Sequence, residues 1–102
     1  MSSFNNNYDT LESIIFEGGL RIIGLHFHKE LDLMLIVLNN KKVLTRNISG
    51  IEKLKNATAE QLANYSLISK GVGVHWPDVD EDLSLKGFLK EELSSVSVPM
   101  VS

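Results

Sequence analysis

Apolar residues change their spacing along this chain, and each change predicts a different element of secondary structure. The first apolar residues fall at helical spacing behind Asp9 and Glu12, which can form a capping box, although the run 14–16 equally suits a short strand. The polar, Asn-rich start carries no such pattern. We therefore expect residues 1–19 to form an N-terminal extension that is partly disordered or folded as a short helix.

A period of two follows the paired glycines and predicts strands. In the first strand, 22–28, apolar residues at odd-numbered positions form one face. The second, 31–38, is apolar on both faces, which is typical of a central strand. Asn39 and Asn40 predict a tight hairpin, because Asn tolerates the positive φ that such turns require. With a third strand over 43–48, the pattern predicts a three-stranded antiparallel meander.

A helix and a fourth strand are expected next. Thr58 and Gln61 occupy the two positions of a capping box, and the helix that they open should continue to Gly71. Residues 72–76 then alternate between apolar and other side chains as a fourth strand. Pro77 ends that strand, because it has no amide proton to donate to a ladder.

A second helix completes the predicted domain. Ser84 is a suitable N-cap, and the apolar residues after it fall on one helical face. We therefore predict an α+β fold over 20–93: a small antiparallel sheet, made of the three-stranded meander plus a fourth strand, packed with two helices. Residues 94–102 should form a flexible tail. A chain of 102 residues is expected to hold one domain.

Composition excludes several classes of function. There is no cysteine, and the start of the chain has neither the basic region nor the apolar core of a signal peptide, so we expect a cytoplasmic protein. The apolar run 33–38 is too short to span a membrane. The net charge of −3 and scattered lysines argue against nucleic-acid binding. No cofactor motif is present, and none is expected.

A histidine pair is the first of two patterns that could suggest a metal. His26 and His28 lie two residues apart in a predicted strand, so both face the same side, and His75 or a carboxylate from 78–82 could join them. A zinc site needs three or four convergent ligands, whereas the spacing supplies only two. A partly exposed strand face with two polar residues is the favoured interpretation. A metal-binding or small-ligand-binding protein that uses this face and the acidic turn is the alternative.

The acidic stretch after the fourth strand is the best candidate for a binding surface. Asp78, Asp80 and Asp82 alternate as a calcium loop begins, but Leu83 and Leu89 stand where that loop needs Gly and Glu. No nucleophile with an orienting base lies nearby, so we expect no catalytic activity. A rigid aromatic residue beside acids suits docking onto a basic protein surface. The predicted partner-binding residues are Trp76, Pro77, Asp78, Asp80, Glu81 and Asp82.

Residues 71–89 also carry a family resemblance. Their sequence, Gly-Val-Gly-Val-His-Trp-Pro-Asp-Val-Asp-Glu-Asp-Leu-Ser-Leu-Lys-Gly-Phe-Leu, closely resembles the terminal signature of bacterial domain-of-unknown-function family 2442. The segment 56–62 resembles that family's helix opening, and 22–48 is similar in pattern only. The resemblance covers about two thirds of the chain, and residues 1–19 have no counterpart in it.

The resemblance implies a small α+β domain with no established catalytic activity. Some members carry an added DNA-binding domain, for which too few residues follow Leu93 here. Others are suspected antitoxins encoded beside small toxin-like proteins. We therefore expect a non-catalytic protein–protein interaction module, antitoxin-like or scaffolding, with a small basic toxin-like protein as its partner. Open sheet edges would also allow a homodimer.

Overall fold

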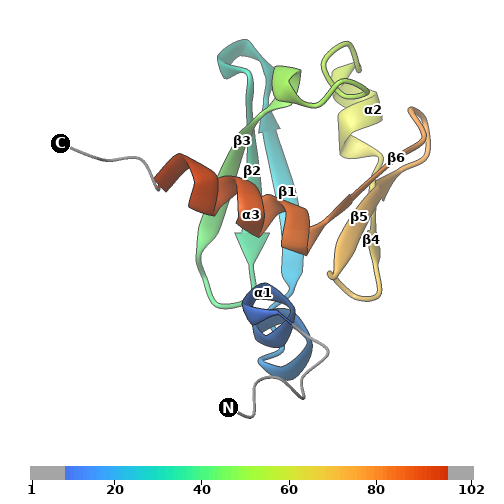
Figure 1. The fold of residues 1–102 in the computed structure, drawn as a ribbon. Helices are drawn as coiled ribbons and strands as arrows, with labels where there is room; N and C mark the ends of the chain where they lie inside the picture. Colours follow the sequence, from blue (N-terminus) through green and yellow to red (C-terminus); the bar gives the residue numbers. More distant parts are fainter. Residues whose placement is uncertain (1–8, 97–102) are drawn as a thin grey trace, which may run out of the picture.

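The computed structural model describes residues 9–96, apart from the side chains of 95 and 96. In these residues, two small sheets and their helices pack around one hydrophobic core (Figure 1). The first sheet has the antiparallel order β1-β2-β3, as the meander predicts. Its strands are β1 (Ile22–His28), β2 (Leu33–Leu38) and β3 (Val43–Asn47). The central position predicted for the strand that is apolar on both faces is confirmed.

A β-bulge changes which residues of β1 are buried. Ile22 pairs with Leu38, but Gly24 pairs with the adjacent Val37, so the ladder has one extra residue in β1. Ile22 is therefore fully buried, whereas the side chain of Ile23 is 59% exposed. The prediction that Ile23 lies on one face of the strand with Leu25 is wrong, because a bulge inverts the alternation on one side of it.

The hairpin between β2 and β3 is present, but its positive φ occurs at Lys41 (73°) and not at an asparagine. The asparagines act through their side chains instead. Asn39 accepts a hydrogen bond from the amide of Arg21 and donates one to the carbonyl of Gly19, both at 3.0 Å. Asn40 accepts a hydrogen bond from the amide of Lys42. This turn therefore holds the N-terminal connection in place as well as reversing the chain.

The fourth predicted strand does not join the meander. It is β5, the centre of a second antiparallel sheet with the order β4-β5-β6. The strands of this sheet are β4 (Ser66–Ile68), β5 (Gly73–Trp76) and β6 (Glu81–Ser84). The two sheets touch where the amide of Ile22 donates to the carbonyl of Gly71 at 2.9 Å. The predicted α+β fold class is confirmed. The prediction of a single sheet that includes this fourth strand is wrong, because the strand belongs to a second sheet.

The second sheet can form because the helix that begins after Thr58 is shorter than predicted, which leaves residues 66–68 free to pair as a strand. Its capping box is present, with the Thr58 hydroxyl accepting from the amide of Gln61 at 3.0 Å, but the helix α2 (Ala59–Ala63) ends far before Gly71. Tyr65 then turns toward β1, where its hydroxyl accepts a hydrogen bond from the amide of Leu25 at 3.0 Å. Residues 66–68 pair with β5, and pairing of this kind leaves no trace in local spacing.

The helix α3 (Leu85–Val96) crosses in front of the first sheet, and the helix α1 (Thr10–Glu12) lies at the lower end of that sheet (Figure 1). The first continues into a π-helical turn, η2 (Ser13–Glu17), and single 3₁₀ turns, η3 (Lys29–Leu31) and η4 (Ile48–Gly50), follow β1 and β3. The helical option for the N-terminal extension is therefore confirmed over these residues. Residues 1–8 of the predicted extension and 97–102 of the predicted tail lie outside the described residues.

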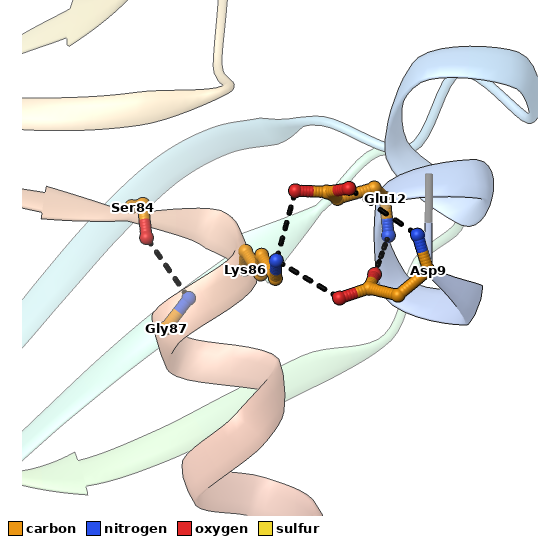
Figure 2. A network of polar contacts seen from close by, with 5 residues as sticks. All are labelled: Asp9, Glu12, Ser84, Lys86 and Gly87. Atoms are coloured by element: carbon orange, nitrogen blue, oxygen red, sulfur yellow. Dashed lines mark hydrogen bonds and ion pairs between the residues drawn. The ribbon is translucent and has the colours of Figure 1, made fainter. Parts of the chain in front are cut away.

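Lys86 joins the N-terminal helix to α3. Its ammonium group is 2.9 Å from Asp9 and 2.8 Å from Glu12, the two residues of the confirmed N-terminal capping box (Figure 2). The pKa of Asp9 is lowered by the amide of Glu12 and then by Lys86, while Lys86 is the main cause of the lowered pKa of Glu12. The two carboxylates in turn raise the pKa of Lys86.

Residues from both sheets and from the helices form the buried core. Ser84 caps α3 as predicted, its hydroxyl accepting from the amide of Gly87 at 2.9 Å (Figure 2). Leu85 and Phe88 of α3 are buried against the sheets, whereas Leu93, predicted on the same apolar face, is 55% exposed. The largest fully buried side chain is that of Trp76. The other large side chains that are fully buried are those of Ile15, Ile22, Met34, Ile36, Leu38, Leu54, Leu62, Val74 and Leu85.

Candidate interaction surface

Trp76, at the end of β5, supports the acidic turn from inside the protein. Its side chain has no exposed surface, and its indole Nε1 donates a hydrogen bond to the carbonyl of Leu62 at 3.0 Å. A buried indole whose N–H has a partner is a stable core anchor. Trp76 therefore lies in the core rather than on the contact surface that we expected it to share. Pro77, the next residue, is exposed.

The turn 77–80 is held by side chains from two other segments. The amide of Asn64 donates to the Asp78 carboxylate at 3.0 Å, and the ammonium group of Lys53 donates to the backbone carbonyl of Asp80 at 2.9 Å. Asp80 itself has a φ of 54°, in the left-handed region that Asp tolerates better than most residues. The exposed carboxylates of Asp78 and Asp80 are therefore presented on a turn that is fixed at both ends.

The acidic stretch continues into a strand, not directly into the last helix as the sequence suggested. Asp82 lies opposite His75 in the β5–β6 ladder, and its carboxylate contacts the imidazole Nδ1. Glu81 lies opposite Trp76, and its carboxylate accepts the amide of Asp82 at 3.0 Å. Asp82 remains exposed, and Glu81 is half-buried. The structure thus places four carboxylates along one turn and strand, which we call the acidic edge: Asp78, Asp80, Glu81 and Asp82.

The metal alternative loses its geometric support. His26 and His28 are exposed on β1, in the first sheet, whereas His75 lies in the second sheet and contacts Asp82. Among residues 9–96, no three histidine, aspartate or glutamate side chains gather closely enough to hold a metal ion. The structure therefore does not unite the histidine pair with the acidic edge.

Among residues 9–96, no helix is long and apolar enough to cross a membrane.

The first sheet presents a second surface, which we did not predict from the sequence. The side of the first sheet that faces away from the buried Met34, Ile36 and Leu38 presents three rows of directly opposed residues. The rows, which together we call the outer face, are Gly24–Val37–Val43, His26–Leu35–Thr45 and His28–Leu33–Asn47. Val43 is 49% exposed, and the side chains contributed by β2 are half-buried.

One signal in the sequence could have located the outer face. The strand β2 is apolar on both sides, which suggested that neighbouring elements cover both. However, the flanking strands alternate, with His26 and His28 on one and Thr45 and Asn47 on the other, which is typical of a sheet that faces solvent on one side. The two patterns together indicate an apolar stripe bordered by polar residues.

These features define a small α+β domain with two three-stranded sheets. A family model described as "Protein of unknown function (DUF2442)" matches residues 22–94, and the chain belongs to that family. The resemblance that the terminal signature suggested is therefore confirmed. The match begins after the N-terminal helix, which Lys86 holds against α3.

Two solved structures share this fold. A solution NMR structure of an uncharacterized protein from Chromobacterium violaceum has a TM-score of 0.65 and 19% sequence identity, covering 93% of this chain and 95% of that one. A crystal structure of a protein of unknown function from Rhodospirillum rubrum has a TM-score of 0.62 and 24% identity, covering 71% of this chain and 87% of that one. No curated protein matches the chain.

Proposed function

We propose that this protein is a non-catalytic interaction module that binds a basic protein partner through the acidic edge. The observation that supports this function is the way the edge is presented. Two of its carboxylates, Asp78 and Asp80, lie on a turn that Asn64 and Lys53 hold from outside and that the buried Trp76 anchors from inside. The other two, Glu81 and Asp82, follow on strand β6. A preorganised surface loses little conformational freedom on binding, so more of its contact energy appears as affinity.

Charge determines the kind of partner that fits. Around the acidic edge, Lys53 contacts the turn at a backbone carbonyl rather than at a carboxylate, and Arg46 lines a hollow together with Asp82. Four carboxylates therefore outnumber the nearby positive charge, which favours lysine- and arginine-rich surfaces and speeds their encounter with this protein. Pro77 adds an exposed apolar contact that is rigid at the start of the turn.

A small basic protein is the partner class that we propose, with this chain neutralising it or serving as its scaffold. An antitoxin-like role would use the same contact, because both roles need a stable complex and neither needs chemistry by this chain. The membership in a family of unknown function agrees with such a role without adding to it. The proposal therefore depends on the geometry and charge of the acidic edge.

Co-purification with a matched pair of variants tests the proposal. In the first variant, Asp78→Asn, Asp80→Asn, Glu81→Gln and Asp82→Asn neutralise the acidic edge. In the control, four exposed glutamates outside the acidic edge are neutralised: Glu17→Gln, Glu30→Gln, Glu52→Gln and Glu60→Gln. Both variants change the net charge equally, so a loss of partner confined to the first variant identifies the acidic edge.

The captured partner should be basic, should bind the purified parent chain in a one-to-one complex, and should dissociate as salt is raised. We expect at least a tenfold weaker complex for the acidic-edge variant and less than a twofold change for the control. Equal binding by the parent and both variants, with all three folded, would contradict the proposed site.

A further inference from the structure

The strand β3 lies at a border of the first sheet and has one side without a neighbouring strand. Within the part of the chain that the structure describes, β3 pairs only with β2, and the register of that pairing runs without a shift. The strand also contains no proline. An edge strand without a bulge or a proline is a ready template for pairing with another extended chain.

Two hydrogen bonds at the ends of the β2–β3 ladder fix which backbone groups point outward. The amide of Leu38 donates to the carbonyl of Lys42 at 2.9 Å, and the amide of Ile48 donates to the carbonyl of Asp32 at 3.1 Å. In an antiparallel ladder, hydrogen-bonded pairs alternate with pairs that are not hydrogen-bonded. The even-numbered residues of β3 therefore bond to β2, whereas the odd-numbered ones turn their backbone groups away from it. These outward residues, which we call the β3 edge, are Val43, Thr45 and Asn47.

A hollow of about 340 Å³ lies beside the later half of the β3 edge. It is lined by Leu33, Thr45, Arg46, Asn47, Glu91 and Glu92. The two glutamates belong to α3, which crosses in front of the sheet and extends past β3 at its last turn (Figure 1). The volume is at the small end of the range for ligand sites, roughly 300–1,000 Å³. It therefore suits a single strand beside the end of the helix, rather than the face of a second domain.

Charge favours one kind of strand in this hollow. Glu91 and Glu92 contribute two carboxylates, against the single guanidinium group of Arg46. The two lysines that precede β3, Lys41 and Lys42, lie at its other end, in the hairpin. The later half of the β3 edge is therefore net negative, which favours an extended segment with lysine or arginine at that end.

We infer that β3 binds an extended, basic segment of another protein as a fourth, antiparallel strand of the first sheet. The outward groups of Val43 and Thr45 supply main-chain hydrogen bonds, which give affinity in strand addition, while side-chain contacts give specificity. Glu91 and Glu92 select basic side chains on the helix side of the added strand. Antiparallel pairing places the N-terminal residues of the segment beside the later half of β3, so its basic residues come first. This contact is separate from the proposed binding at the acidic edge, and either can fail without the other.

Two peptides with blocked ends test the inference on the full chain. The first, Lys-Thr-Lys-Thr-Val-Thr-Val-Thr, carries its lysines on one face of its N-terminal half, and the second has glutamate in place of both lysines. Amide chemical shifts of the ¹⁵N-labelled protein locate each peptide on the chain. We expect the lysine peptide to shift the amides of Val43, Thr45 and Asn47, with a dissociation constant of about 1 mM or below. The glutamate peptide should bind about fivefold or more weakly.

Two variants at Thr45 separate backbone pairing from side-chain contact. Thr45→Pro removes an outward amide without removing a bond to β2, and proline is tolerated where the amide of an edge strand faces solvent. Thr45→Ala is the matched control, because it shortens the side chain and keeps the amide. Both variants are checked for folding by circular dichroism. We expect the affinity for the lysine peptide to fall by about fivefold or more in Thr45→Pro, and by less than about twofold in Thr45→Ala.

Charge reversal gives a test that does not depend on proline. In the double variant Glu91→Lys and Glu92→Lys, the glutamate peptide should bind more tightly than the lysine peptide, and an unchanged preference would contradict the role of these carboxylates. Shifts confined to residues 78–82 would place the lysine peptide at the acidic edge and overturn this inference, with the proposed function intact. An absence of shifts in β3 with up to about 5 mM peptide, or equal binding by the parent and a folded Thr45→Pro, would overturn it as well.

Discussion

The indole Nε1 of Trp76 donates a hydrogen bond to the backbone carbonyl of Leu62 at 3.0 Å, and both side chains are fully buried. The helix α2 has only five residues, so most of its carbonyls have no partner within the helix. Trp76 supplies one of these carbonyls with a donor and joins the end of α2 to β5. The same residue precedes the acidic edge, whose position therefore depends on this bond.

The substitution Trp76→Phe should test this connection. Phenylalanine keeps an aromatic ring in the core but loses the donor and leaves space beside the Leu62 carbonyl. We expect the free energy of unfolding to fall by about 2–4 kcal/mol, measured by urea denaturation. An unchanged midpoint would contradict the anchoring role.

Tyr65→Phe should remove the hydrogen bond at the bulge of β1. The Tyr65 hydroxyl accepts from the amide of Leu25, while its ring packs edge-to-face on Phe27 with centroids 6.2 Å apart. The ring contact survives the substitution, so we expect a loss of about 1 kcal/mol. Hydrogen exchange should accelerate at the Leu25 amide more than elsewhere in β1. Uniform acceleration along the strand would indicate a global effect instead.

Lys86→Met should weaken the attachment of the N-terminal helix and its dependence on pH. The pKa values of Asp9 and Glu12 are lowered from their ordinary values of 3.8 and 4.5, so their contribution to stability is present above those values and is lost as pH falls through the lowered ones. The pKa of Lys86 is raised above 10.5, so its contribution is lost only as pH rises beyond that value.

In the parent, we therefore expect thermal stability to decrease as pH falls below about 4.5, and this decrease should be smaller in Lys86→Met. Lys90→Met, on the same helix, is the matched control, because Lys90 has only a minor electrostatic effect on Asp9. Hydrogen exchange within Thr10–Glu17 should increase in Lys86→Met alone. Equal pH profiles for the parent and Lys86→Met would contradict the role of this lysine.

Gly71→Ala should be strongly destabilising. Gly71 has a φ of 117°, and a Cβ at this position would lie 2.3 Å from the backbone carbonyl oxygen of Ile22, where the two sheets meet. We expect a loss of about 3 kcal/mol or more, measured by urea denaturation. Gly50→Ala is the control, because a Cβ there meets nothing within 4 Å and should change stability little. A tolerated Gly71→Ala would mean that the sheets can separate without cost.

Local signals predicted the N-terminal ends of the helices well. The capping box of Thr58 and Gln61, the capping pair of Asp9 and Glu12, and the Ser84 cap are all present. Each depends on groups three residues apart, and such groups meet whenever the chain turns into a helix, whatever the rest of the molecule does. The meander could be predicted equally well, because consecutive strands joined by short turns usually pair with each other.

The acidic edge was only partly predictable, because the contacts that hold it join residues from different elements. Its residues were evident as a run of carboxylates after Trp76, but their presentation depends on Asn64 and Lys53, which are distant in the chain. The contact between Asp82 and His75 requires the β5–β6 register. Spacing alone carried no information on these partners, since none of them belongs to the same local element.

The sequence by itself determined the α+β class, the strand order of the meander, the helix caps and the family. Only the tertiary structure decided that α2 ends at Ala63, that a second sheet forms around β5, and that Trp76 is buried. These outcomes depend on contacts such as that between Tyr65 and Leu25, forty residues apart. Tertiary contacts of this kind outweigh the small differences in local propensity between helix and strand.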